Sequence, residues 1–246
     1  MQMILQSVVG STALGLQTPT SDIDLMGIGL ETCSEALPVV GQPLENIVTT
    51  SPDSTTYTLR KWLSLAVKGN PTILGMLFIT PQFSIAVGQE LLDLAPAIIS
   101  RQCGPAFLGY MRAQRERLAG ERGQMRIHRP ELISQHGYDV KYAMHALRLG
   151  YQGIELMETG RMSYPMTGLT RELLMDVRAG VVPKSSLMSV LSATELLLAE
   201  AIEESSLQAK PDLERIQTWV NTTYLRHWTA STHSTPTIRS SHPHSG

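Results

Sequence analysis

The stretch that decides the fold is GSTALG at residues 10–15, which is followed after a short gap by SDIDL at residues 21–25. The apolar run before it, residues 4–9, is typical of a strand, and glycine at its end indicates a turn. Side chains two positions apart on a strand share a face. We therefore expect Asp22 and Asp24 to project side by side, while Ile23 enters the core.

These residue types suit phosphate chemistry. Two adjacent carboxylates form a hard oxygen site for Mg²⁺ or Mn²⁺, which keep several substrate oxygens as ligands. Gly10 and Ser11 can present free backbone N–H groups and a hydroxyl to phosphate, and glycine allows a close approach. A phosphate cradle beside metal-binding carboxylates is what nucleotidyl transfer requires, with two ions expected. The alternative is an accidental Asp-x-Asp exposed on an edge strand.

The combined pattern resembles a known signature. Gly-Ser, Ala and Gly within residues 10–15, then Ser21 and both aspartates, are similar to the DNA polymerase beta-like nucleotidyltransferase superfamily. The resemblance implies an α/β (α+β) fold: a minimal nucleotidyltransferase core with a mixed sheet, followed by a mainly α-helical region. It also implies that Ser21 joins Gly10 and Ser11 in binding the nucleotide phosphates.

The superfamily usually supplies a third carboxylate from a following strand. Asp53, in a β-branched stretch, is the candidate. It would complete the metal site and help to accept the proton of the attacking hydroxyl. Asp53 can equally be read as a turn residue or a helix cap, and Glu45 is a weaker substitute.

Three further segments resemble the RlaP family, polymerase beta-like predicted nucleotidyltransferases named for their association with RNA-repair ligases. They are YTLRKWLSLAVKGNPT at 57–72, YDVKYAMHALRL at 138–149 and ELMETG at 155–160, and the likeness covers about residues 4–180. It implies an RNA 3′ end as the acceptor. The chain departs from the family pattern at Gly75, because a Glu commonly follows Asn-Pro by a few residues in that family.

A basic helix face is predicted beyond the core. Lys141, His145 and Arg148 have i, i+4, i+7 spacing, so they share one face beside an apolar stripe. Three potential cations in register suit a triphosphate or a nucleic-acid phosphate. The alternatives are a solvated face with incidental charges and, for His145, a satisfied core histidine.

Residues 112–129 are rich in arginine, and glycines at 120 and 123 break the predicted helix, which places the later arginines on a mobile loop. The stretch either guides a polynucleotide or a protein substrate to the site, or forms a solubilising surface paired with the acidic segment 195–204. Both interpretations stay open. The arginines are Arg112, Arg115, Arg117, Arg122, Arg126 and Arg129.

Composition sets wider bounds. The chain of 246 residues carries 20 Lys and Arg against 22 Asp and Glu, which excludes a histone-like binder of polyanions. Two cysteines make neither a disulfide framework nor a thiolate metal site. No run approaches the length of a membrane span, and the start lacks the features of a secretory signal. We expect a cytoplasmic protein without membrane contact; the sequence indicates no oligomeric state.

The order of elements predicts strands in the first 60 residues, a helix from about residue 58 to Gly69, and a helical remainder. We divide the chain into a nucleotidyltransferase core at 1–80, a helical region at 81–228 that completes the active-site cleft, and a disordered tail at 229–246. The later helices are predicted at 89–100 with a break at Pro96, 105–118, 138–151, 169–179, 185–206 and 212–227.

The predicted function is metal-dependent transfer of NMP from an NTP to an acceptor hydroxyl, with an RNA 3′ end as the acceptor. A protein hydroxyl is the alternative, because nucleotidylating (AMPylating) antitoxins carry the same Gly-Ser and Asp-x-Asp pattern. A catalytically inactive nucleotide-binding sensor is a third hypothesis, to which the departure at Gly75 adds weight.

Overall fold

The structure is a computed structural model that describes residues 1–51, 53–119 and 129–232. Within them, five strands form one mixed sheet in the order β3-β4-β2-β1-β5. β2 pairs antiparallel with β1 and parallel with β4, while the edge strands β3 and β5 pair antiparallel with their neighbours. The predicted mixed sheet is therefore confirmed. The strands are β1 Gln2–Val8, β2 Leu25–Leu30, β3 Asn46–Thr50, β4 Asp53–Thr58 and β5 Phe83–Ser84.

The second strand starts later than the sequence predicts. β2 begins at Leu25, so Asp22 and Asp24 lie in the segment that leads into it, and Ile23 is 62% exposed instead of entering the core. The cause lies in the partner strand: β1 ends at Val8, opposite Leu25, so no residue is left in it to pair with Ile23.

Short helices connect and cover the sheet. The predicted helix after residue 58 is α3 Leu59–Ala66, and the Thr58 side chain caps it by accepting from Lys61 N. α3 ends before Asn70-Pro71, with its cap at Val67, and Asn70-Pro71 starts α4 Pro71–Gly75, because Asn70 caps it and proline suits a first helical position. The others are α1 Gly10–Ala13, α2 Cys33–Ala36, α5 Ala86–Asp93 and α6 Ala95–Ile98, with the predicted break falling at Leu94.

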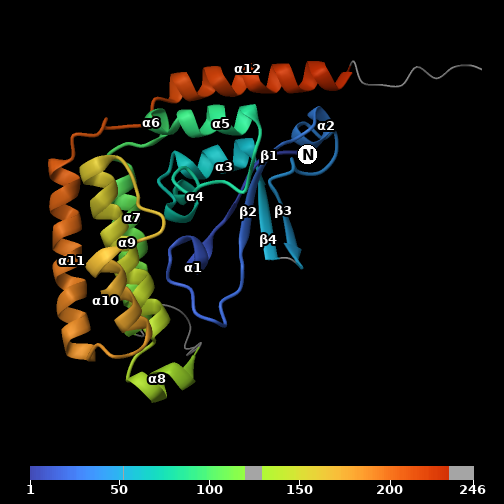
Figure 1. The fold of residues 1–246 in the computed structure, drawn as a ribbon. Coiled ribbons are helices and arrows are strands. Elements are labelled where there is room, and N and C mark those ends of the chain that lie inside the picture. The colour runs from blue at the N-terminus through green and yellow to red at the C-terminus, as the bar shows by residue number, and fades with distance from the viewer. Residues whose placement is uncertain (52, 120–128, 233–246) are drawn as a thin grey trace, which may run out of the picture.

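The second half of the chain forms a helical layer beside the sheet (Figure 1). α9 packs against α7, α10 and α11. Two of its glycines face neighbouring helices so closely that a Cβ on Gly150 would lie 2.4 Å from Thr194 Cγ2 of α11, and one on Gly153 would lie 3.0 Å from Phe107 Cβ of α7. The helices are α7 Cys103–Ala119, α8 Pro130–His136, α9 Val140–Thr159, α10 Gly168–Arg178 and α11 Lys184–Glu204.

The last helix returns to the first half of the chain. α12 Leu213–Thr232 lies along α5 and α6, far in sequence from the strands it reaches (Figure 1). The predicted tail is thus wrong for residues 229–232, which continue α12; the Trp228 indole donates to Glu31 O at 3.0 Å and holds the end of this helix on the sheet. Residues 233–246 of the predicted tail lie outside the part of the chain that the structure describes. One hydrophobic cluster runs through both halves, and the boundaries 1–80 and 81–228 stay a prediction.

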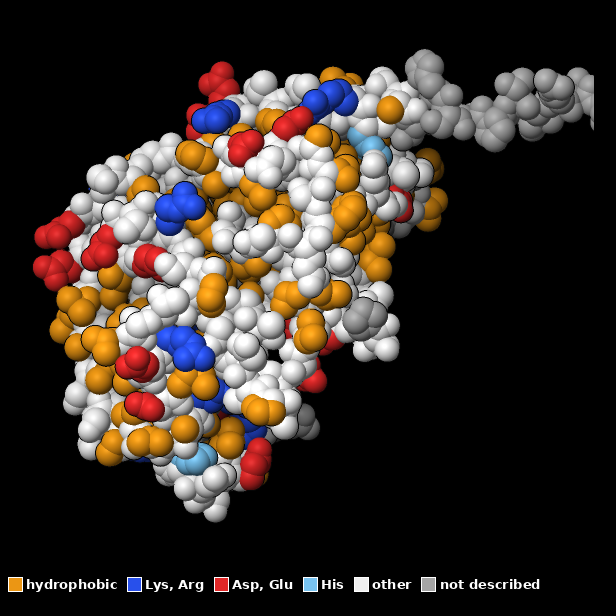
Figure 2. All heavy atoms as spheres, viewed as in Figure 1, with side chains coloured by type: hydrophobic (Ala, Val, Ile, Leu, Met, Phe, Trp, Pro, Cys, Tyr) orange, Lys and Arg blue, Asp and Glu red, His pale blue; other side chains and the backbone are white. Residues whose placement is uncertain are grey.

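One described helix, α11, has the length and the hydropathy of a membrane span. It lies against α7 and α9 and buries Leu187, Leu191 and Leu198, as a packed helix of a globular domain does. Acidic side chains gather near its C-terminal end in the space-filling view (Figure 2). Length and hydropathy alone are weak evidence for a membrane span, and the compartment stays a prediction.

Candidate active site

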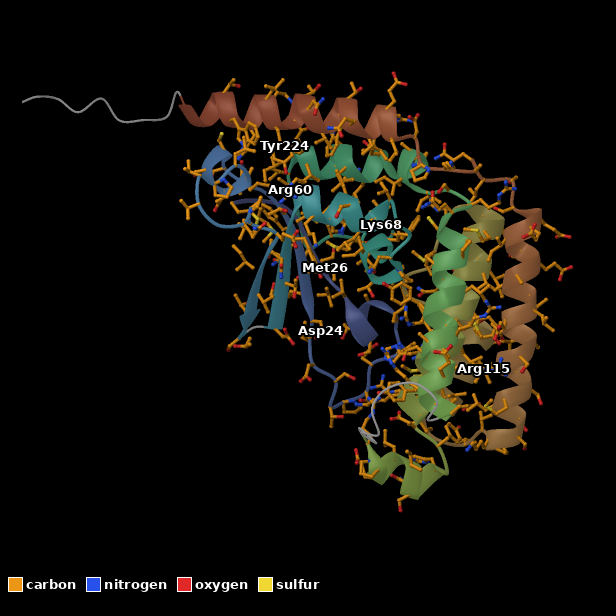
Figure 3. The ribbon with its side chains drawn as sticks, turned by 180° about the vertical axis from the view of Figure 1, so that it is seen from behind. Asp24, Met26, Arg60, Lys68, Arg115 and Tyr224 are labelled. Carbon is orange, nitrogen blue, oxygen red and sulfur yellow. The ribbon has the colours of Figure 1, made fainter. Side chains whose placement is uncertain are left out.

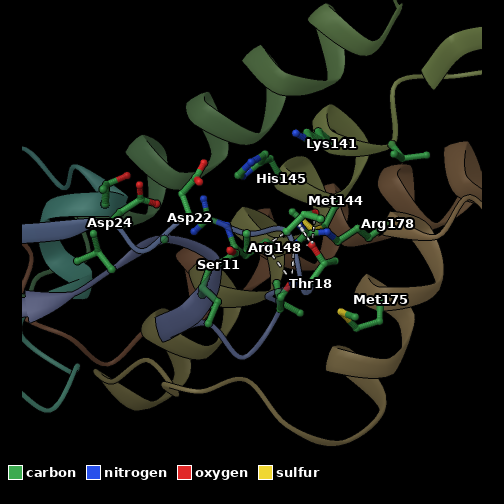
Figure 4. A pocket seen from close by; sticks show the side chains of 18 of the residues that line it. Ser11, Thr18, Asp22, Asp24, Lys141, Met144, His145, Arg148, Met175 and Arg178 are labelled. Carbon is green, nitrogen blue, oxygen red and sulfur yellow. Dashed lines mark hydrogen bonds between the residues drawn. The ribbon is translucent and has the colours of Figure 1, made fainter. Parts of the chain in front are cut away.

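A pocket of about 630 Å³ lies between the end of the sheet and the helical layer (Figure 4). One wall comes from the segment that leads from β1 into β2, and the opposite wall comes from α9 and α10. The pocket brings together most of the residues predicted from the sequence. They are Gly10, Ser11, Ser21, Asp22 and Asp24 on the first wall, and Lys141, His145 and Arg148 on the second.

The acidic end of this pocket, formed by Asp22 and Asp24 with Asp53 nearby, contains like charges that no ion pair joins to a cation within the described residues. Asp24 directly precedes β2 and Asp53 is the first residue of β4; the two parallel strands align Leu25 with Ser54, so these carboxylates are neighbours. Burial raises the pKa of Asp24, and the charges of Asp53 and then Asp22 raise it further. Asp53 is not in the pocket lining, but it acts on Asp24 through its charge.

Gly10 makes the close approach of Asp24 possible. Its φ is +66°, a conformation that side-chain-bearing residues rarely adopt, and a Cβ on it would lie 2.3 Å from Asp24 Oδ2. The carboxylate therefore occupies the space that any other residue at position 10 would fill. Ser11 follows in the single turn of α1 and lines the same pocket.

The basic wall is built on the first turns of α9. The Asp139 side chain caps this helix by accepting from Lys141 N and Tyr142 N. Arg148, only 9% exposed, donates from Nη1 to Gln152 Oε1 at 2.7 Å, while its Nε has no hydrogen-bond partner among the described residues. Burial lowers the pKa of Arg148. A buried guanidinium with an unused donor is suited to an anionic ligand.

His145 differs in charge from the prediction. Burial and the nearby cations, Arg148 foremost, lower the pKa of His145 to about 4. The ring is therefore neutral at physiological pH, whereas the sequence spacing treats it as one of three potential cations. It lies on the predicted face and lines the pocket as a neutral donor and acceptor.

Arg178 and Tyr164 line the pocket but were not identified from the sequence. Arg178, in the last turn of α10, donates to Leu16 O and to the hydroxyls of Thr18 and Ser21. Tyr164 lies beside Gly75, where a Cβ would come within 2.5 Å of the Tyr164 hydroxyl. The departure from the family pattern at Gly75 thus leaves room for a tyrosine. No spacing rule relates either residue to the motif at 10–25, because both are distant in sequence.

The structure separates Glu45 from the acidic end and gives the Ser21 hydroxyl hydrogen-bond partners within the protein. Glu45 forms an ion pair with Lys61 at 2.7 Å and its backbone bonds Thr58 N, at the opposite end of β4 from Asp53. It is therefore wrong as a substitute for the third carboxylate. The hydroxyl of Ser21, predicted to bind phosphate, accepts from Thr18 N at 2.9 Å and from Arg178.

Three described arginines of the stretch, Arg112, Arg115 and Arg129, form ion pairs. Arg112 and Arg115 of α7 both bind Glu195 of α11, at 2.7 and 2.8 Å, which matches the interpretation as a surface paired with the acidic segment. Arg129 binds Asp139 at 2.9 Å and lies over the ring of Tyr142. Arg122, Arg126 and the glycines at 120 and 123 lie outside the described residues.

The acidic end fits a hard divalent cation that also binds substrate oxygens. Across residues 1–51, 53–119 and 129–232, no three His, Cys, Asp or Glu side chains are close enough to hold a metal on their own. The crowded carboxylates nevertheless repel one another, as the raised pKa of Asp24 shows, and a cation would relieve this repulsion. Mg²⁺ commonly has one or two protein carboxylates and completes its shell with phosphate oxygens and water.

A mixed sheet with an acidic strand end, opposite a basic helix across one pocket, is consistent with the polymerase beta-like nucleotidyltransferase fold. The chain matches the family model of RlaP, described as RNA repair pathway DNA polymerase beta family, over residues 1–239, and it belongs to that family.

Other comparisons add little. No curated protein matches the chain. Among solved structures, it is similar to a nucleotidyltransferase-like protein from Exiguobacterium sibiricum 255-15 at 12% identity, covering 82% of this chain and 68% of that one with a TM-score of 0.29. A TM-score this low gives no support of its own to the assignment, which rests on the family match.

Proposed function

We propose that this protein transfers NMP from an NTP to an acceptor hydroxyl in a metal-dependent reaction. The observation that carries the proposal is one pocket with crowded carboxylates at one end and, at the other, cations that form no ion pair within the described residues. A metal–nucleotide complex has the complementary arrangement, because its cation and its phosphate oxygens need opposite charges from the protein.

The proposed role of each residue follows from the charge of its side chain. Asp22 and Asp24, with Asp53 beside them, would hold one or two Mg²⁺ or Mn²⁺ ions, which would neutralise the triphosphate and lower the pKa of the acceptor hydroxyl. Gly10 and Ser11 lie where they can bind the β- and γ-phosphates.

The basic wall receives the rest of the triphosphate. Lys141 and the free Nε of buried Arg148 add positive charge there. Neutral His145 can donate one hydrogen bond without adding a charge.

The proposed reaction is one displacement at phosphorus. The acceptor oxygen forms a bond to the α-phosphorus, and the bond from that phosphorus to the bridging oxygen of the β-phosphate breaks. Pyrophosphate leaves with the bonding electron pair, and the proton of the acceptor hydroxyl passes to a nearby base, for which Asp53 is the candidate.

We propose an RNA 3′ end as the acceptor, because the family is described as belonging to an RNA repair pathway. A protein hydroxyl and an inactive nucleotide sensor are the competing hypotheses. The pairing of Arg112 and Arg115 with Glu195 reduces the positive charge that α7 offers to RNA, so the acceptor has to be determined directly.

The deciding experiment incubates the protein with α-³²P-labelled NTPs and Mg²⁺ or Mn²⁺. The acceptors are an RNA with a free 3′ hydroxyl, the same RNA blocked at its 3′ end, a mixed protein fraction, and none. We expect label on the free RNA only, and none with Asp22→Asn or with EDTA. Label on protein would favour the AMPylating alternative. Nucleotide retained without any transfer would favour the sensor.

A further inference from the structure

The segment that carries Asp22 into the pocket has no regular secondary structure of its own. Asp24 is fixed by the sheet, because its carbonyl oxygen accepts from Val9 N at 2.9 Å and Leu25 pairs with Val8. Asp22 lies further out, after residues 16–21, and is exposed. Its position relative to Asp24 therefore depends on what holds that segment.

A closed network of hydrogen bonds holds it, and Arg178 is at the centre. The Arg178 guanidinium donates from Nη1 to Leu16 O and from Nη2 to Ser21 Oγ at 3.2 Å. Ser21 Oγ also accepts from Thr18 N at 2.9 Å and lies 3.1 Å from Thr18 Oγ1. The network ends at Ser21, the residue directly before Asp22.

The support for Arg178 is rigid. Its helix, α10, buries Leu174 and Val177 and packs on α9. The same helix region binds the segment at two more places, where Arg171 Nε donates to Gly15 O at 2.8 Å and Met166 N donates to Leu14 O at 3.1 Å. An arginine of a packed helix can therefore hold in place a loop that has no strand pairing of its own.

The charge of Arg178 has no anionic partner in the described residues, and burial lowers its pKa. Like Arg148 it lines the pocket, but its Nη1 and Nη2 donors are directed at Leu16, Thr18 and Ser21 instead of lying unused. The two arginines therefore have different tasks: Arg148 is available to a ligand, and Arg178 is committed to the loop.

We infer that Arg178 is a positioning residue that, with the Ser21 hydroxyl, sets the place of Asp22 beside Asp24 and thereby the cation affinity of the site. The inference rests on the proposed function, since it gives the two aspartates the role of cation ligands. The inference assigns the Ser21 hydroxyl to support of the loop instead of to phosphate binding.

The test measures Mn²⁺ alone, by the electron paramagnetic resonance signal of the free ion, and ATP binding in EDTA by calorimetry. Arg178→Lys keeps the charge but cannot reach three acceptors, and Ser21→Ala removes one acceptor without changing α10. We expect both to weaken Mn²⁺ binding by about tenfold to a hundredfold, the range for groups that support metal ligands, with ATP binding in EDTA unchanged. Glu172→Asp, which changes an exposed side chain of the same helix and keeps its charge, is the matched control and leaves both affinities unchanged.

Two results would overturn the inference: a loss of ATP binding in EDTA with unchanged Mn²⁺ affinity, which makes Arg178 a phosphate ligand, or no Mn²⁺ binding by the wild-type protein. If Arg178→Lys fails to fold in a thermal melt, Ser21→Ala decides the question. A wild-type protein that binds Mn²⁺ through this network but transfers no label contradicts the proposed function and leaves the positioning role standing.

Discussion

The two ends of strand β2 carry acidic residues with opposite surroundings. Asp24 precedes the strand, and its pKa is raised by burial first and then by the charges of Asp53 and Asp22. Glu31 follows the strand and is 0% exposed, yet it accepts from the Tyr224 hydroxyl at 2.7 Å and lies 3.8 Å from Arg60 Nε. Figure 3 shows Tyr224 and Arg60 near α12, with Asp24 at the other end of the sheet.

The difference shows how partners decide what a carboxylate does. At the Glu31 end the chain itself supplies a hydroxyl donor to Oε2 and a guanidinium 3.8 Å from Oε1, so the carboxylate contributes to holding α3 and α12 on the sheet. At the Asp24 end the chain supplies more negative charge, and the missing cation has to come from a ligand. An excess of like charge in a pocket is destabilising for the fold and useful for binding.

The largest effect is expected from Asp24→Asn. Transfer of label should fall by at least about a hundredfold, because the neutral amide loses its metal-binding charge. The raised pKa means that Asp24 favours folding below its ordinary value of 3.8 and loses this contribution as pH rises above it. The variant should therefore melt no lower than wild type at neutral pH. Near-normal transfer by the folded variant would remove Asp24 from the active site.

Asp53→Ala comes next. We expect turnover to fall by about tenfold to a hundredfold with nucleotide affinity little changed, since a base acts on the attacking hydroxyl more than on the triphosphate. Steady-state kinetics and equilibrium binding measure the two quantities separately. If the melting temperature falls instead while turnover is kept, Asp53 has a structural role, as the alternative interpretation of it as a turn residue or a helix cap proposes.

Tyr224→Phe probes the other end of β2. It leaves the buried Glu31 charge without its hydroxyl donor, so the free energy of unfolding should fall by about 2 kcal/mol. Transfer per folded molecule should stay the same, because this end does not reach the pocket. Urea unfolding checks the first quantity, with Leu225→Ala on the exposed side of α12 as the control. Equal stability of both variants would contradict the distinction between the two ends.

The smallest effect concerns pH and His145. The pKa of His145 falls from 6.5 to about 4 in the folded chain, so the unfolded chain binds more protons between these values. Stability is fully present above pH 6.5 and is lost as pH falls toward 4, by roughly 1–3 kcal/mol. His145→Gln should flatten this part of the curve, measured by urea midpoints at several pH values. An unchanged slope would show that the ring is not desolvated.

The sequence predicts the parts of this molecule that are local. Gly10, Ser11, Asp22 and Asp24 are separated by few residues, so their spacing alone indicates a shared site. The helix face at Lys141 is predicted by its period. The start of β2 is not predicted by the sequence, because it depends on where β1 ends and not on the alternation of polar and apolar residues around Ile23.

The missed features are long-range contacts. Arg178 reaches Ser21 across 157 positions, and Tyr224 reaches Glu31 across 193. No propensity or motif relates such pairs, since the packing of α10 and α12 alone brings them together. The spacing left His145 open as a cation or a core histidine, because its pKa is set by burial and by cations from α9, from α10 and from Arg129 directly before α8, which a single-helix pattern does not show.

The attachment of α12 to Glu31 also has a consequence for biosynthesis. The ribosome makes Glu31 early, whereas its hydroxyl donor emerges only after 193 further residues. Until then the carboxylate must stay in water, because burying it without a donor is unfavourable. Burial of Glu31 is therefore complete only after the C-terminal helix has been made. A chain truncated before α12 should stay partly unfolded and be degraded by cellular proteases.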